Sequence, residues 1–193
     1  MNMVEYSELV NGVNIHIGAC PEIVVIDALR HIVRDFCKRT KVWIYESPEL
    51  ITEEGKLSYE LTLPDQSAVF HIWGIDGRSG NYQELADIYL LMPKTLIFNK
   101  QPSVGKTLKP LVALIPTVKS ISFPEHIREA YEEHLISGAV AYLQMQPFRD
   151  WSEPNATQAH QNKYELGIIE AKRLRDDGLN ISKSRTRVRA RYI

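Results

Sequence analysis

The sequence predicts an α+β protein: a three-helix bundle with an inserted, mostly antiparallel β module and an extended basic arm at the C-terminus. Apolar residues recur with helical spacing at first, change to strand-like alternation near Thr40, and return to helical spacing near Ile121. The last fifteen residues carry five cations and no Asp or Glu. The expected domains are a helical domain of residues 1–40 and 120–178, an inserted β module of residues 41–119, and an arm of residues 179–193.

The first helix is expected from Pro21 to about residue 40. Its buried stripe consists of Val25, Ile26, Leu29, Ile32, Val33 and Phe36. These residues repeat every three or four positions, which is typical of a helix with one buried face. Residues 1–19 are mixed, and Ile15–Ile17 fit either a short strand or a lead-in to the helix.

Two further helices are expected between Phe123 and Gly178, at about residues 124–146 and 153–177. Pro124 suits a first helical turn, Ser152 can cap the second helix, and Gly178 is a good left-handed end. The apolar positions of the first of the two are Ile127, Ala130, Tyr131, Leu135, Gly138, Ala139, Tyr142 and Met145. Small residues near Gly138 allow close backbone approach. We therefore expect Leu29, Phe36, Leu135 and Tyr142 to meet in one core.

The β module is expected to contain six short strands, which favours a sandwich or small barrel. The segment 77–87 is polar and is expected to be a loop. The strands fall at Val42–Ile44, Tyr59–Leu63, Ala68–Trp73, Ile88–Met92, Leu96–Phe98 and Leu111–Val118, the fourth and fifth forming a hairpin around Pro93-Lys94.

Composition is that of a globular protein, with 44% hydrophobic residues and a net charge of −1. That charge is uneven, because removing the five cations of the arm from 23 leaves 18 basic against 24 acidic residues. No stretch approaches the ~20 apolar residues of a membrane span, so no membrane partner is expected. Cys20 and Cys37 would lie near opposite ends of one helix, too far apart for a disulfide.

Enzymatic chemistry, a metal and a cofactor are all unsupported. Val104-Gly105-Lys106-Thr107 ends like a phosphate-binding loop, but the glycine required five residues before Gly105 is Lys100. No two of the six histidines have the spacing of a helical metal pair. Glu132 and Glu133 are adjacent, so they diverge on a helix. We expect a polar loop and ordinary surface histidines.

The arm is the positive signal for function. Arginines alternate with other residues, so an extended chain places all four on one side. The residues expected to contact a partner are Lys183, Arg185, Arg187, Val188, Arg189, Arg191 and Tyr192. Three interpretations remain open: an arm that lies along an acidic protein, an arm that binds nucleic acid, and a solvated tail.

Three segments together resemble the head-to-tail connector, or adaptor, proteins of tailed bacteriophages. They are Pro21–Arg30 running into Asp35–Trp43, the helix from Glu132 to Gln146, and Pro147–Pro154 followed by Tyr164–Ile168. The resemblance implies a ring, commonly of twelve subunits, docked beneath the portal protein and joined to the next tail protein, a nozzle or tail tube. Genomic DNA would pass through the lumen without sequence-specific binding.

The resemblance also implies a location in the virion neck after assembly in the host cytoplasm, and it implies that the arm contacts the portal. Because phage neck parts assemble in sequence, the free protein would be monomeric before docking. A net-negative body suits a channel that must not grip DNA. Two other classes stay open: a DNA-binding accessory protein that uses the arginine-rich arm, and a small enzyme.

Overall fold

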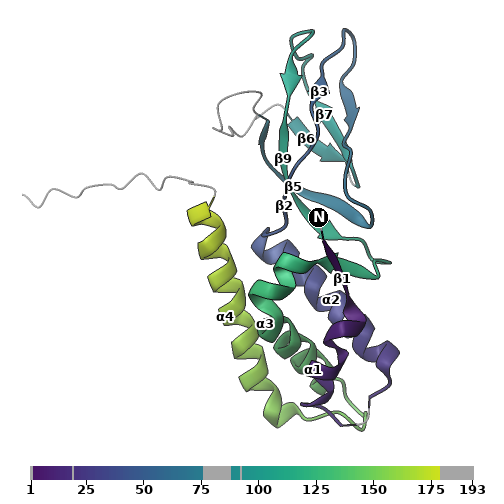
Figure 1. Ribbon diagram of the computed structural model, residues 1–193, viewed down its shortest axis with the longest axis vertical. Coiled ribbons are helices and arrows are strands. Elements are labelled where there is room, and N and C mark those ends of the chain that lie inside the picture. The colour runs from purple at the N-terminus through teal and green to yellow at the C-terminus, as the bar shows by residue number, and fades with distance from the viewer. Residues whose placement is uncertain (1, 19, 76–87, 92, 179–193) are drawn as a thin grey trace, which may run out of the picture.

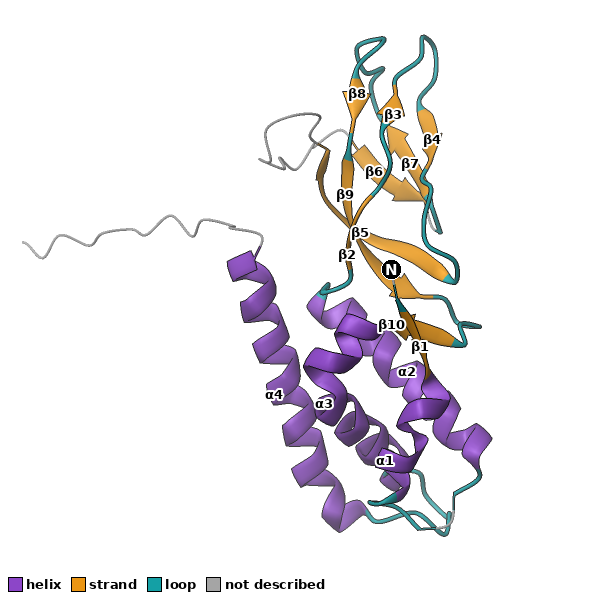
Figure 2. Cartoon of the chain, viewed as in Figure 1, coloured by secondary structure: helices purple, strands orange, loops and turns teal. Residues whose placement is uncertain are grey.

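The computed structural model describes residues 2–18, 20–75, 88–91 and 93–178. It is an elongated molecule with helices at one end and strands at the other (Figures 1 and 2). The helices are α1 (Val10–Asn14), α2 (Glu22–Thr40), α3 (Glu125–Gln144) and α4 (Pro154–Gly178), with a 3₁₀ helix at Tyr6–Leu9. The predicted mixed α+β fold, with antiparallel strands inserted between helices, is confirmed.

Helix α2 buries the stripe that the sequence predicted, and Val25, Leu29, Val33 and Phe36 are inaccessible to solvent. It ends at Lys41, whose φ of 56° is left-handed and whose N–H donates to the Cys37 carbonyl at 2.8 Å. That geometry closes the last helical turn and redirects the chain into the strands.

Helices α2, α3 and α4 come into close contact at Gly138. A Cβ at that position would lie 2.8 Å from Ile32 Cγ2 and 2.7 Å from Tyr164 Cδ2, so only glycine fits. The Tyr164 hydroxyl donates to Asp35 Oδ2 at 2.8 Å. The predicted close approach at the small residues of α3 is therefore confirmed.

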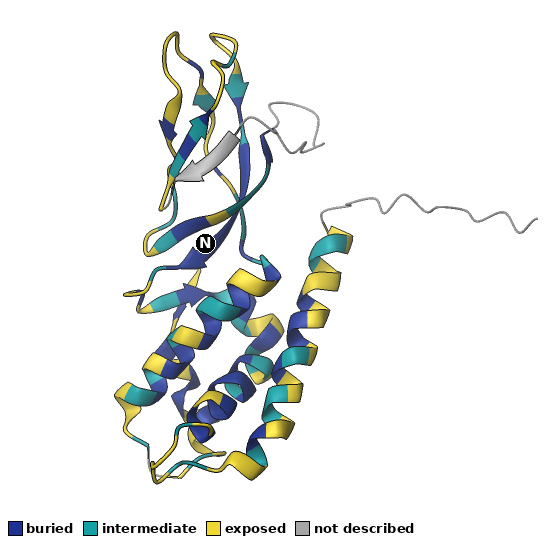
Figure 3. Cartoon of the chain, turned by 180° about the vertical axis from the view of Figure 1, so that it is seen from behind, coloured by how far each residue is buried: buried dark blue, intermediate teal, exposed yellow. Residues whose placement is uncertain are grey.

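Three of the four predicted core residues, Leu29, Phe36 and Leu135, are buried, but the placement of Tyr142 was wrong. Tyr142 is 41% exposed and Met145 is 65% exposed. The reason is that α2 and α4 meet near the β module and diverge toward the other end (Figure 3), where α3 is left partly uncovered. Tyr142 stacks on His31 of α2 instead, with ring centroids 4.8 Å apart.

Helix α3 is kinked at Tyr131, whose φ of −135° and ψ of 16° are not helical. Ala130, Tyr131 and Glu132 are ordinary helix residues, and no proline or glycine near them predicts a kink. The Tyr131 ring instead turns into the core and lies 5.0 Å from the ring of Phe36. Tertiary packing thus overrides local helix preference.

The N-terminal residues are more ordered than the sequence indicated. Strand β1 (Met3–Glu5) pairs antiparallel with β10 (Ser122–Pro124), and Pro124 therefore precedes α3 as its N-cap. Tyr6 stacks on Phe123 at 5.2 Å and shares a hydrogen bond with Ser120 at 2.9 Å. A strand at Ile15–Ile17 was wrong, because α1 ends at Asn14 and the chain turns after it.

All strand pairings between described residues are antiparallel, in four small sheets of two or three strands. The sequence predicted six strands and a sandwich or small barrel, whereas the described part of residues 41–119 has eight strands, in sheets of two or three strands. They range from two residues in β3 (Leu50–Ile51) to nine in β5 (Ser67–Ile75). The predicted hairpin around Pro93-Lys94 is confirmed and consists of β6 (Ile88–Leu91) and β7 (Thr95–Phe98). The segment 77–87 lies outside the described residues. The remaining strands are β2 (Ile44–Glu46), β4 (Ser58–Glu60), β8 (Thr107–Leu108) and β9 (Pro110–Pro116).

Candidate interaction surfaces

The arm residues predicted to contact a partner lie outside the described residues, which end at Gly178. They are Lys183, Arg185, Arg187, Val188, Arg189, Arg191 and Tyr192. The nearest described part of this candidate site is the last turn of α4, from which the arm departs. That turn lies beside the junction between helices and strands (Figure 1).

Arg175 ties this last turn to the rest of the molecule. Its guanidinium donates to the Thr40 carbonyl at the end of α2 and to the Asp176 carboxylate. Its Cζ also lies 5.1 Å from the ring centroid of Trp73 in β5, within the range of a cation–π interaction. The Arg175 side chain is only 12% exposed. One side chain therefore joins α4, α2 and the β module at the base of the arm.

A second contact between α2 and α4 lies two to three helical turns before Arg175. Arg39 of α2 donates from Nη1 to Glu165 Oε1 of α4 at 2.8 Å, and Nη2 donates to the other carboxylate oxygen. This forked hydrogen bond lowers the pKa of the Glu165 carboxyl. The pair is more than a third exposed, so solvent screens it and its contribution to stability is small.

Exposed cations lie in the last turns of α2 and α4, and α4 also carries Asp176 and Asp177 in its last turn. Lys38 lies in the last turn of α2, and Lys172 and Arg173 lie in the last two turns of α4. Within the part of the chain that the structure describes, none of the three forms an ion pair. No local sequence pattern predicts these cations or Trp73 as neighbours of the arm, because α2, α4 and β5 meet only in the folded chain.

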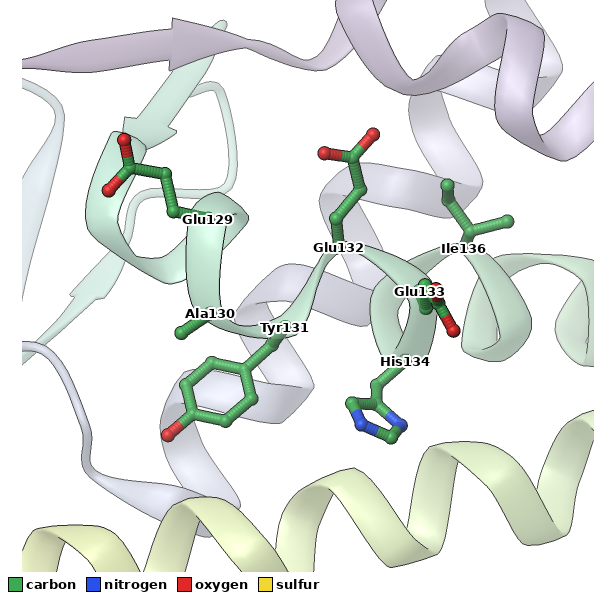
Figure 4. A pocket seen from close by; sticks show the side chains of 7 residues that line it. All are labelled: Glu129, Ala130, Tyr131, Glu132, Glu133, His134 and Ile136. Atoms are coloured by element: carbon green, nitrogen blue, oxygen red, sulfur yellow. The ribbon is translucent and has the colours of Figure 1, made fainter.

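A pocket of about 470 Å³ lies at the kink of α3 (Figure 4). Two of its three carboxylates are engaged: Glu132 pairs with Arg128, and Glu133 accepts a hydrogen bond from Lys163 Nζ at 2.7 Å, which lowers the pKa of Glu133. The side chains of Glu132 and His134 leave the helix on opposite sides. Glu132 and Glu133 have different partners, and His134 Nε2 lies 3.7 Å from Glu170 Oε2 of α4. The lining residues are Glu129, Ala130, Tyr131, Glu132, Glu133, His134 and Ile136.

The described residues contain no group of three or more His, Cys, Asp or Glu side chains placed to hold a metal ion. Cys37 is buried, which raises the pKa of its thiol to about 12, and Cys20 is a partly buried free thiol. Gly105 has a φ of 72° in a turn that leads into strand β8, so the expected polar loop is confirmed.

The loop between α3 and α4 forms the end of the helical region away from the β module (Figure 2). Ser152 was expected to cap α4, but its hydroxyl donates to the Gln144 carbonyl at 3.5 Å, and its N–H donates to the Arg149 carbonyl at 3.0 Å. The helix begins two residues later. Phe148, within this loop, is fully exposed with a φ of 59°.

Comparison with known protein families found no match, and a search of curated proteins also found none. In the described ranges, none of the helices combines the length and the apolar character needed to cross a bilayer.

Proposed function

We propose that the protein is a structural virion protein, a head-to-tail adaptor without enzymatic activity, metal or cofactor. Copies of it form a ring, commonly of twelve, that docks under the portal protein and binds the next tail protein, a nozzle or tail tube. Genomic DNA passes through the lumen. The protein acts in the virion neck after assembly in the host cytoplasm. Support comes from the phage-connector resemblance of the segments that build α2, α3, the connecting loop and α4.

The described architecture suits this role. In this proposal α2, α3 and α4 form a three-helix bundle that supplies the ring wall. Their contacts at Gly138, with Ile32 and Tyr164, make them one body. The β module projects from one end of that body, so it offers surfaces that are separate from the wall (Figure 2).

The observation that carries the proposal is the base of the arm. Arg175 fixes the end of α4, and Lys38, Lys172 and Arg173 are exposed near it without an ion pair among the described residues. The last turn of α4 also carries Asp176, which pairs with Arg175, and the exposed Asp177, so its charge is mixed. Because Arg175 holds the end of α4, the arm begins from a fixed point, and its five cations, with no acidic residue among them, suit an acidic surface of another molecule.

An acidic portal surface suits the arm better than DNA does. Apart from the arm, the chain has 18 basic and 24 acidic residues, and such a body repels the phosphate backbone. Arginines on one side of an extended segment can each form a forked pair with a carboxylate. Val188 and Tyr192 would face the other side and pack.

The experiment measures binding to purified portal protein and to duplex DNA by the full chain and by a chain that ends at Gly178. Truncation should leave the thermal unfolding midpoint nearly unchanged while portal binding falls strongly. Reversing the four arginines to glutamate should weaken binding more than truncation, because like charges then repel. Imaging of the full-length complex should show a ring.

A matched control reverses two exposed lysines of the β module, Lys106→Glu and Lys119→Glu, and should bind portal normally. Normal portal binding by the truncated chain, together with lost DNA affinity, would favour the alternative of a DNA-binding accessory protein. In this proposal the ring forms only when copies dock on the portal. A ring that forms without portal, or a compact dimer that portal does not dissociate, would contradict this order of assembly.

A further inference from the structure

The tip formed by the α3–α4 loop carries an unusual side chain. Phe148 is 100% exposed, and its φ of 59° lies in the left-handed region that bulky residues rarely adopt. A strained backbone that presents a large apolar group to water is a reason to look for a function. We propose that the free protein pairs reversibly with a second copy of itself through this tip, Phe148 of each copy seating in an apolar groove of the other.

The loop that presents Phe148 is held in place by hydrogen bonds. Trp151 Nε1 donates to Gln146 Oε1 at 3.3 Å, and the Glu153 N–H donates to the Gln144 carbonyl at 3.1 Å. Trp151 packs on the main core. The backbone that presents Phe148 is therefore ordered before any partner arrives, which lowers the entropic cost of ordering the loop on binding.

The groove lies beside the tip, between the end of α3 and the start of α4. It has a volume of about 430 Å³ and is lined by Met145, Pro154, Thr157, Gln158 and Gln161. Met145 is 65% exposed, although the spacing of apolar residues in α3 assigns it to a buried face. Met145 is thus a large apolar side chain that the subunit leaves uncovered at this groove, as is typical of an interaction surface.

Charge at the tip favours a second copy as the occupant. Arg149 and Asp150 follow Phe148 directly, both are exposed, and the described residues supply neither with an ion pair. In a two-fold pair, Arg149 of one copy faces Asp150 of the other, and the reverse contact forms at the same time. The tip is thus complementary to itself in charge, and it also carries both the apolar side chain and the groove.

This arrangement predicts a two-fold and weak interaction. Because the side chain and the groove lie on one surface, a single rotation satisfies both contacts, as in an isologous dimer. A loop and two helix ends form a patch smaller than the ~800 Å² per partner of a stable interface. The pairing should therefore depend on concentration and be reversible.

The test is sedimentation velocity of the full chain over a wide concentration range. The wild-type protein should shift from monomer to dimer as concentration rises. Phe148→Asn, which tolerates the left-handed backbone, should raise the dimer Kd by about thirtyfold or more, the scale of a hot-spot residue. Its thermal midpoint should not fall, so a lost dimer would not reflect misfolding.

Two charge variants test the two-fold geometry. Arg149→Asp gives a tip with two negative charges, and Asp150→Arg gives a tip with two positive charges, so each alone should remain monomeric. A mixture of the two should form a heterodimer. Ile169→Asn removes an equally apolar exposed residue of α4 away from the tip and should dimerise like the wild type.

Monomer at every concentration would overturn the proposal, and so would a dimer that Phe148→Asn leaves intact. A dimer that Ile169→Asn abolishes would place the interface on α4 instead. If the charge variants associate singly but not as a mixture, the contact is not two-fold. None of these measurements contains portal protein, so their failure would not refute the adaptor proposal, and a failure of portal binding would not refute the dimer.

Discussion

Replacing Gly138 with alanine tests how tightly the three long helices pack. The new Cβ would lie 2.7 Å from the Tyr164 ring and 2.8 Å from the Ile32 side chain, distances that real Cβ atoms essentially never show. Neither neighbour can yield easily. The Tyr164 hydroxyl is hydrogen-bonded to Asp35, and Ile32 is β-branched and stiff about χ1. The helices must therefore move apart to admit one methyl group.

The size of the effect follows from two opposing contributions. Overpacking a filled core costs about 1–3 kcal/mol, and two stiff neighbours place this site near 3. Alanine has a higher helix propensity than glycine, which stabilises the variant by about 1 kcal/mol. The net destabilisation of about 2 kcal/mol should lower the thermal midpoint by roughly 4–8 °C in a chain of this length.

Thermal unfolding followed by circular dichroism measures this change. Gly178→Ala is the matched control, since nothing lies within 4 Å of a Cβ there. It should leave the midpoint unchanged or raise it slightly, because alanine restricts the unfolded chain. If Gly138→Ala is as stable as the wild type, the three helices do not meet at this residue and the packing argument fails.

Three further predictions concern the core and its titrating groups. Leu29→Ala should lower the free energy of unfolding in urea by about 2–5 kcal/mol, and an unchanged midpoint would show that Leu29 is not buried. Maleimide at pH 7–8 should modify Cys20 but not Cys37 in the folded protein, because burial raises the Cys37 pKa to about 12 and keeps its thiol protonated; equal labelling would contradict this. Arg39 lowers the pKa of Glu165, so its small stabilisation is present at neutral pH and is lost as pH falls through the lowered value. Glu165→Gln should therefore reduce the acid dependence of stability, as measured by unfolding at pH 3–7.

Local patterns in the sequence predicted those elements whose neighbours are close in the chain. The stripe of α2 repeats with helical period, and Pro93-Lys94 separates two apolar runs that can only pair with each other. Strand β1 was missed because its partner, β10, lies more than a hundred residues away and each strand has only three residues. No local pattern encodes such a pairing.

The errors in α3 have the same origin. Apolar spacing identifies which side chains share a face, but it does not tell how far the neighbouring helices extend over that face. Tyr131 has a non-helical backbone and lies 5.0 Å from the ring of Phe36, and Tyr142 and Met145, at the C-terminal end of α3, are exposed. Met145 was predicted to be buried but is exposed, and the candidate pairing surface at the tip depends on that exposure.

Pairing through the tip and docking through the arm make a joint prediction. The two surfaces lie at opposite ends of α4, whose 25 residues span roughly 37 Å. In a tip-to-tip pair whose two-fold axis runs across α4, the two copies of α4 point in opposite senses, whereas all copies in a ring beneath one portal point the same way. A copy must therefore leave its pair before it docks, and the apparent affinity for portal is reduced by the fraction that is monomeric.

Portal binding should consequently weaken when the wild-type protein is presented above its dimer Kd. Phe148→Asn should abolish that dependence and bind with the intrinsic affinity at every concentration. Sedimentation gives the monomer fraction at each adaptor concentration. Titration of a fixed portal concentration with excess adaptor then gives the apparent affinity of the wild type and the intrinsic affinity of Phe148→Asn. Weaker portal binding by Phe148→Asn at low concentration would instead place Phe148 in the contacts of the docked ring, and competition between pairing and docking would then be excluded.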